Sequence, residues 1–309
     1  MRRLFKKIRQ KIESLPLLSK IFLSPYYVLR TSRPIRSILL KESKHLYAAH
    51  RETLLPHEDR VLGDLKHHGL AVTNLTELFP GEDLLSQFRS FAEHTFVGAK
   101  IGRKKTFLIY LWDNAPTLDL KNPFVEVTLR PTVLRIANAY LGVASKFTFY
   151  SVNKTVPVPR GSEAMGSQRW HRDPGIKRVC KMFIYVSDVP DETAGPFTYA
   201  LGSHHGGRWG TLEKQRLSGR DGRYPSPELI SKTIPLSDQK LCTGRAGTII
   251  FCDTLGIHKG GYSTSRERIM FTALFETPDA FGGHKFKYPS DIETEMQNLG
   301  PLARYAVSP

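Results

Sequence analysis

Cysteine is scarce in this chain, and the arrangement of the few cysteines excludes two kinds of small protein. Three occur in 309 residues, at Cys180, Cys242 and Cys252, and no two of them form a CxxC pair. An odd number of widely spaced cysteines supplies neither a disulfide framework nor a structural zinc site, and it is typical of a reducing compartment. We therefore expect a cytoplasmic location, with Cys180 and Cys252 buried in the apolar runs that contain them.

Long apolar stretches and acidic residues are also lacking. No run of about 18 uninterrupted apolar residues occurs, which argues against a transmembrane helix. The 29 acidic residues are outnumbered by 45 Lys and Arg, for a net charge of +16. Residues 1–50 contain twelve Lys and Arg and two acids, so they carry +10, and the remaining 259 residues carry +6. The sequence thus divides into a basic N-terminal segment, 1–50, and a mildly basic domain, 51–309.

The first 23 residues, MRRLFKKIRQKIESLPLLSKIFL, predict a basic amphipathic helix that is interrupted near Pro16. Glu13, Pro16 and Lys20 break the apolar region that a signal peptide requires. Such a helix either lies on an anionic membrane surface or packs its apolar face on its own domain or a second subunit. No recognition motif or aromatic platform supports binding of nucleic acid, so we expect no nucleic-acid partner. The sequence leaves the oligomeric state open.

The body begins with helical patterns and continues with strands. Residues 57–69, 81–96 and 123–142 predict helices, two of them ended by Gly69 and Gly142, and residues 70–75 predict a strand. Further strands are predicted at 146–155, 179–189, 247–253 and 268–276, separated by turn residues. This order predicts one α+β domain with an antiparallel barrel or jelly roll at its centre.

The stretch QRWHRDPG, residues 168–175, contains the triplet HRD and raises two interpretations. A kinase catalytic loop requires an Asn five residues after the Asp, a Gly-rich loop and a DFG motif, but Asp173 is followed by PGIKR and no DFG occurs. The other interpretation is the start of an iron site. A second HxD, at His57 and Asp59, has no strand before it and looks like the polar start of a helix.

The iron interpretation requires two imidazoles and one carboxylate on one face of an octahedron. On a strand, His171 and Asp173 point the same way while Arg172 points away. His258, in FCDTLGIHKGG, follows another predicted strand and is the candidate third ligand. Arg268 starts the next strand, where its planar guanidinium suits the distal carboxylate of 2-oxoglutarate.

These motifs form an ordered set with the segments MFIYVSDVPDETAGPFTYALGSHH and GTIIFCDTLGIHKGGYSTSRERIMFTALFE. The set resembles the phytanoyl-CoA dioxygenase family over roughly residues 58–280. The resemblance implies a double-stranded β-helix (jelly-roll, cupin-like) core flanked by helices. It further implies Fe(II) bound by His171, Asp173 and His258, and 2-oxoglutarate anchored by Arg268, with Arg266 as the alternative. The family places cosubstrate contacts on the strand 146–155, which makes Tyr150 a further candidate.

The activity that this resemblance implies is an Fe(II)- and 2-oxoglutarate-dependent dioxygenase, which consumes O2 and releases succinate and CO2. Halogenating relatives lack the carboxylate ligand, so the presence of Asp173 favours hydroxylation of a C–H bond. Arg103, Lys104 and Lys105 suggest an anionic small-molecule substrate, and the basic N-terminus suggests one linked to a lipid or a glycan precursor. The alternative is a jelly-roll binding or regulatory module without turnover, associated with a membrane through residues 1–23.

Overall fold

The strands form two antiparallel sheets in the computed structural model, which describes residues 32–96, 100–101, 106–111, 116–175, 177–212, 224–280 and 283–309. The large sheet has the strand order β1 (Leu70–Asn74), β8 (Thr248–Cys252), β5 (Val179–Tyr185), β10 (Arg268–Glu276), β4 (Lys146–Thr155), β3 (Leu108–Tyr110) and β2 (Lys100–Ile101). The small sheet has the order β7 (Gln239–Cys242), β6 (Phe197–Ala200) and β9 (His258–Lys259).

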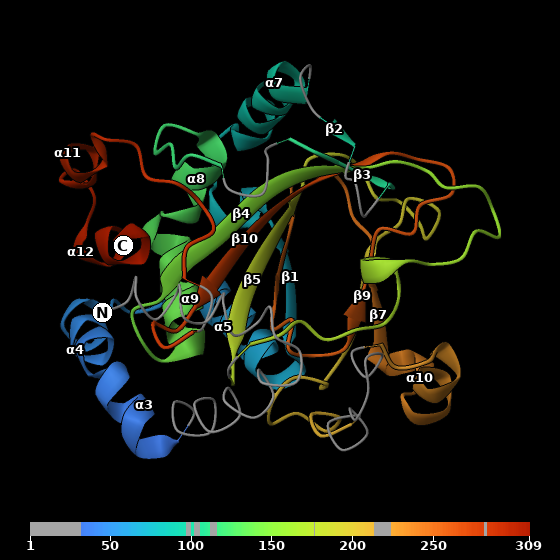
Figure 1. Cartoon of the computed structure of the whole chain (residues 1–309), viewed down its shortest axis with the longest axis horizontal. Coiled ribbons are helices and arrows are strands. Elements are labelled where there is room, and N and C mark those ends of the chain that lie inside the picture. Colours follow the sequence, from blue (N-terminus) through green and yellow to red (C-terminus); the bar gives the residue numbers. More distant parts are fainter. Residues whose placement is uncertain are drawn as a thin grey trace, which may run out of the picture.

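Helices cover the face of the large sheet that lies away from the small sheet (Figure 1). The helices of the described residues are α3 (Arg33–Leu39), α4 (Lys41–His50), α5 (Pro56–His68), α6 (Leu75–Leu78), α7 (Leu84–Phe96), α8 (Pro123–Thr128), α9 (Pro131–Leu141), α10 (Pro227–Thr233), α11 (Ile292–Met296) and α12 (Pro301–Val307). Of these, α10 lies beside the small sheet. The mixed α+β class with antiparallel sheets is therefore confirmed.

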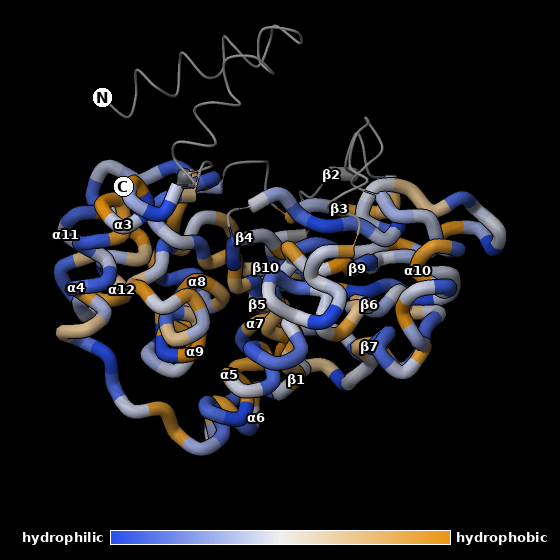
Figure 2. Tube along the Cα trace, turned by 90° about the horizontal axis from the view of Figure 1, so that it is seen from below, coloured by the Kyte–Doolittle hydropathy of each residue, from blue (hydrophilic) through white to orange (hydrophobic). Residues whose placement is uncertain are grey.

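Two apolar clusters hold the layers together. The main one joins helical side chains such as Leu65 and Phe124 to Ile184 and Phe271 of the large sheet. The second lies between the two sheets and includes Phe183 and Tyr199 with Ile250. Figure 2 shows the apolar segments in orange, and they occur both in the strands and in the helices that pack on them. Because both faces of the central strands are buried, β8 is a continuous apolar run, TIIFC, that lacks a polar alternation.

Several local predictions are confirmed, and one is corrected. Helices α5 and α9 end at Gly69 and Gly142, both in the left-handed conformation with φ of 75° and 73°. Strands β4 and β10 have the predicted bounds. Residues 123–142, however, form two helices, because Pro131 holds the preceding Arg130 in an extended conformation with ψ of 148°.

Helices α3 and α4 pack against the rest of the fold. Arg36 of α3 forms an ion pair with Asp279, which follows β10, and both side chains are buried. In α4, the carbonyl of Ser43 accepts a hydrogen bond from the backbone N–H of Ala144 at 3.0 Å. The division of the chain at residue 50 stays a prediction, and residues 1–23 lie outside the described residues. None of the helices in the described ranges combines the length and apolarity needed to cross a membrane.

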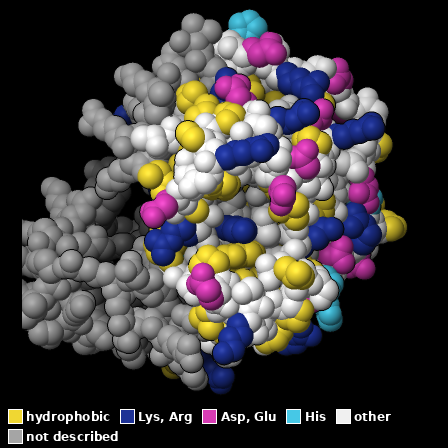
Figure 3. All heavy atoms as spheres, turned by 90° about the vertical axis from the view of Figure 1, so that its right-hand side faces the viewer, with side chains coloured by type: hydrophobic (Ala, Val, Ile, Leu, Met, Phe, Trp, Pro, Cys, Tyr) yellow, Lys and Arg dark blue, Asp and Glu magenta, His cyan; other side chains and the backbone are white. Residues whose placement is uncertain are grey.

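Charge is dispersed on the side of the molecule that carries α10. There, Lys and Arg side chains are interspersed with Asp, Glu and apolar groups (Figure 3). A single basic stripe, which is the electrostatic footprint of nucleic-acid binding, does not appear on this face.

Candidate metal centre

Backbone hydrogen bonds bring the three predicted ligands together at the small sheet. His171 and His258 form an antiparallel bridge in which each backbone N–H donates to the other residue's carbonyl, at 2.8 and 2.9 Å. Two residues further on, the N–H of Asp173 donates to the carbonyl of Thr254 at 2.8 Å. The main chain thus fixes both segments before any ligand binds.

The ligand atoms of His171, Asp173 and His258 all lie within 4.8 Å of one another. The Asp173 carboxylate oxygens are 3.7 Å from His171 Nε2 and 3.9 Å from His258 Nε2. Each imidazole donates its Nδ1–H to a backbone carbonyl two residues earlier, Arg169 at 2.8 Å and Gly256 at 3.0 Å. These bonds fix the tautomer in which Nε2 carries the lone pair, and metal-binding histidines in proteins are held in the same way.

The ionisation of the cluster also suits a metal. Burial, together with the neighbouring His171, lowers the pKa of His258 to about 3, so this imidazole is neutral at neutral pH. Burial raises the pKa of Asp173, but Lys181 and the two imidazoles outweigh this and hold it below its ordinary range. A neutral imidazole and an ionised carboxylate are the forms that bind a divalent cation.

Arg172 points away from this cluster, as predicted for the middle residue of HRD. Its guanidinium donates to the carbonyls of Ser203 at 2.6 Å and Leu255 at 2.5 Å. It therefore ties the strand of the first two ligands to the loops around it. The rival motif at His57 and Asp59 lies in the first turn of α5, as expected.

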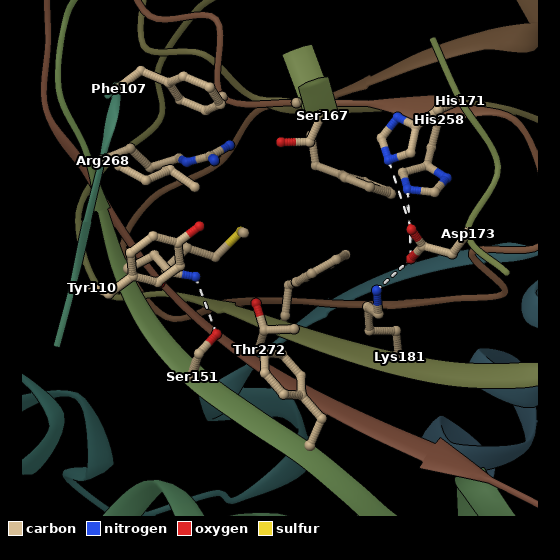
Figure 4. Close-up of a pocket in the computed structure, with 18 residues that line it drawn as sticks. Phe107, Tyr110, Ser151, Ser167, His171, Asp173, Lys181, His258, Arg268 and Thr272 are labelled. Carbon is tan, nitrogen blue, oxygen red and sulfur yellow. Dashed lines mark hydrogen bonds and ion pairs between the residues drawn. The ribbon is translucent and has the colours of Figure 1, made fainter. Parts of the chain in front are cut away.

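A pocket of about 250 Å³ opens between the two sheets beside the cluster. His171, His258 and Asp173 lie at one end and Arg268 at the other (Figure 4). The walls are aromatic, aliphatic and polar residues and two glycines from both sheets and their loops: Phe107, Leu108, Tyr110, Phe149, Ser151, Asn153, Ser167, Lys181, Phe183, Phe197, Gly260, Gly261, Met270 and Thr272. A few convergent polar groups in an apolar cavity are typical of a small-molecule site.

Arg268 is a buried cation that has no carboxylate partner among the described residues. Its guanidinium donates to the carbonyl of Gly195 and to Thr155 Oγ1, the latter at 3.3 Å, while its Nε lacks a hydrogen-bond partner. Burial lowers its pKa. Arg266 is exposed, so of the two predicted arginines Arg268 is the one that lines the pocket.

Tyr150 does not line this pocket, which contradicts its predicted contact with the cosubstrate. It faces the helices, where its hydroxyl donates to the carbonyl of Thr117 at 2.9 Å and its ring packs near Phe286. Alternate residues of a strand point to opposite faces, so Ser151 and Asn153 face the pocket instead. Asn153 Oδ1 is buried there without a hydrogen-bond partner. Arg103, Lys104 and Lys105 lie outside the described residues.

Lys181 is a site residue that the sequence analysis missed. It lies on β5, lines the pocket, and its Nζ is 2.5 Å from Asp173 Oδ2. Burial lowers its pKa, but the adjacent carboxylate outweighs this and raises it. A single lysine inside the apolar run VCKMFIY is the feature that could have identified it, because lysine is rarely buried without a partner.

The fold of this chain is similar to that of known enzyme structures. No family model matches this chain, and no curated protein matches it. Among solved structures, the epimerase SnoN in complex with Fe3+, alpha ketoglutarate and nogalamycin RO is 15% identical over 74% of this chain and 87% of its own, with a TM-score of 0.54.

Two further structures match with lower TM-scores. The carbocyclase SnoK from nogalamycin biosynthesis is 17% identical over 81% of this chain and 95% of its own, with a TM-score of 0.47. HygX from Streptomyces hygroscopicus, with nickel and 2-oxoglutarate bound, is 14% identical over 72% and 87%, with a TM-score of 0.49. The likeness to SnoN establishes a shared fold; at this identity it does not assign the activity.

Proposed function

We propose that this protein is a non-haem Fe(II)- and 2-oxoglutarate-dependent dioxygenase that hydroxylates a C–H bond of a small molecule and releases succinate and CO2. The observation that carries the proposal is one pocket with two imidazoles and a carboxylate at one end and, at the other, a buried arginine that has no carboxylate partner among the described residues. The first group suits octahedral Fe(II) with open positions. The second suits the carboxylate of a ligand.

The strand order supports a double-stranded β-helix. From β4 to β10 the chain passes repeatedly between the sheets: β4, β5, β8 and β10 belong to the large sheet, and the His171 bridge, the consecutive strands β6 and β7, and β9 belong to the small one. SnoN, which shares the fold, is named as a complex with Fe3+ and alpha ketoglutarate, and this supports the same cofactors here. Membership of the phytanoyl-CoA dioxygenase family is part of the proposal and rests on the sequence motifs.

When bound, Fe(II) supplies activation of O2, coupled to oxidative decarboxylation of 2-oxoglutarate. His171, Asp173 and His258, which all line the pocket, would hold the metal. Arg268, assisted by Thr155, binds the distal carboxylate of 2-oxoglutarate and so sets its orientation. The aromatic rings of Phe107, Phe183 and Phe197 exclude water from the reacting groups.

The proposal is tested with anaerobically purified protein. We expect one Fe(II) per chain and O2-dependent formation of succinate from 2-oxoglutarate. His258→Ala should abolish iron binding and leave the fold intact by circular dichroism, whereas His57→Ala, in the rival HxD motif, should retain the metal. Full iron occupancy in His258→Ala would refute the metal assignment. Iron and 2-oxoglutarate binding without succinate, across a panel of candidate substrates, would favour the binding-module alternative.

Hydroxylation is the most specific element of the proposal. SnoN is named an epimerase, so this fold does not restrict the chemistry to hydroxylation. Hydroxylation adds one oxygen atom to the substrate and epimerisation adds none, and mass spectrometry of the product distinguishes them.

We also propose that residues 1–23 attach this cytoplasmic enzyme peripherally to an anionic membrane.

A further inference from the structure

Lys181 gives the pocket a positive charge that the metal and 2-oxoglutarate do not account for. Its side chain enters the pocket from the floor formed by the large sheet and reaches the carboxylate of Asp173 (Figure 4). In the described residues, Asp173 is its one hydrogen-bond partner. An ammonium group has three N–H donors, so two of them remain for a ligand.

The formal charges lining the pocket make the excess explicit. The charged side chains among the described lining residues are Asp173, Lys181 and Arg268, which sum to one positive charge, since an imidazole that binds a metal is in its neutral form. A divalent metal and dianionic 2-oxoglutarate cancel each other. The loaded pocket therefore keeps one positive charge. Glu276, the next acid on the same strand face as Thr272, accepts a hydrogen bond from Thr148 and does not line the pocket.

A positive charge in a partly dehydrated cavity is unfavourable unless an anion accompanies it. We infer that the substrate of the proposed dioxygenase carries an anionic group, a carboxylate, sulfonate or phosphate, which binds Lys181 beside the metal. This inference rests on the proposed function. Because Lys181 contacts a metal ligand directly, the carbon that is oxidised lies within a few bonds of that anionic group.

The geometry separates this role from that of Arg268. The two cations lie at opposite ends of the pocket, with Ser151 and Thr272 on the floor between them (Figure 4). The proposed function assigns Arg268 to the distal carboxylate of 2-oxoglutarate, and Lys181 then remains for the substrate. The positive net charge of the domain, +6 over residues 51–309, also favours the approach of anions.

The test uses two small probes of similar shape, methanesulfonate, which is an anion, and dimethyl sulfone, which is neutral. Full-length protein is loaded with Co(II) and 2-oxoglutarate, and the relaxation of the probe's methyl protons is measured by NMR, since a paramagnetic ion accelerates it only at short range. Zn(II)-loaded protein is the diamagnetic control. We expect methanesulfonate to bind roughly ten-fold or more tightly than dimethyl sulfone, as a charge-assisted hydrogen bond requires.

Two variants assign the effect to its residue. Lys181→Met should lose the preference for the anion, and Lys181→Arg should retain it. Equal relaxation of both probes in the wild-type protein overturns the inference, whatever the variants do. An unchanged preference in Lys181→Met overturns the role of Lys181, and so does a loss of 2-oxoglutarate affinity as large as the loss for methanesulfonate. Failure to bind Co(II) or 2-oxoglutarate at all contradicts the proposed function instead.

Discussion

Replacing Arg268 by methionine should separate the binding of the cosubstrate from the stability of the fold. Arg268 is 3% exposed and its hydrogen-bond acceptors are uncharged, so the described residues supply no counter-charge to its guanidinium. Removing it leaves no carboxylate unpaired. We therefore expect metal-loaded Arg268→Met without 2-oxoglutarate to be as stable as the wild type, or more stable, because a buried cation without a partner is unfavourable.

The cost should appear when 2-oxoglutarate binds. A hydrogen-bonded pair of charges contributes about 1.5–3 kcal/mol, which corresponds to a dissociation constant raised roughly 10- to 150-fold. At a 2-oxoglutarate concentration about 100 times the wild-type dissociation constant, the ligand stabilises the wild-type protein by about 2.7 kcal/mol. In a variant with a 100-fold weaker site, the same concentration stabilises by only about 0.4 kcal/mol.

The assay is calorimetric titration of Co(II)-loaded protein with 2-oxoglutarate and with 2-oxopentanoate, which has a methyl group in place of the distal carboxylate. The variant should lose affinity for 2-oxoglutarate and keep its affinity for 2-oxopentanoate. Arg266→Met, which removes an exposed arginine two residues away, is the matched control and should bind both compounds like the wild type. An equal loss for both compounds in Arg268→Met would show that the arginine does not contact the distal carboxylate.

Three further predictions concern stability and attachment. Burial raises the pKa of Asp253 from 3.8 to about 6, so the stabilisation by its protonated form is present below about pH 4 and is lost as the pH rises through 6. Relative to the Asp253→Asn variant, the free energy of unfolding of the wild type, measured in urea, should fall by about 3 kcal/mol over this range. Arg36→Met leaves Asp279 buried without its cation and should cost about 3–5 kcal/mol, most of which Arg36→Met/Asp279→Leu should recover in the same assay. Removal of residues 1–31 should abolish sedimentation with anionic vesicles at low salt and leave iron binding unchanged, since each basic residue near an anionic membrane surface contributes about 1 kcal/mol to binding. Failure of the full-length protein to sediment with such vesicles would contradict membrane attachment.

The cluster of His171, Asp173 and His258 could be predicted because its chemistry is local in sequence. The HxD spacing places His171 and Asp173 on one side of an extended segment, and a predicted strand precedes His258. Arg268 could be predicted because it begins a strand that follows this last ligand. The pairing of His171 with His258 depends on which strands become neighbours, and the order of the strands cannot be predicted from the sequence of any single segment.

Tyr150 and Lys181 show where the sequence stops being informative. In β4 both faces are buried, so its burial pattern does not reveal which alternate set faces the helices and which faces the pocket. Tyr150 and Val152 both face the helices, whereas the prediction placed Tyr150 at the cosubstrate. Lys181 was overlooked because the apolar residues around it indicate a core strand, and its partner Asp173 lies on a different segment.

The reciprocal hydrogen bonds between His171 and His258 have a consequence for which ion the protein acquires. A site held open by its own backbone discriminates poorly between ions of similar size, and nitrogen and oxygen ligands bind Co(II), Ni(II), Cu(II) and Zn(II) more tightly than Fe(II). If the site binds iron as proposed, the supply of each ion then decides which one occupies it. Protein prepared in a zinc-rich medium should accordingly be mismetallated and inactive, and chelation followed by anaerobic Fe(II) should restore it.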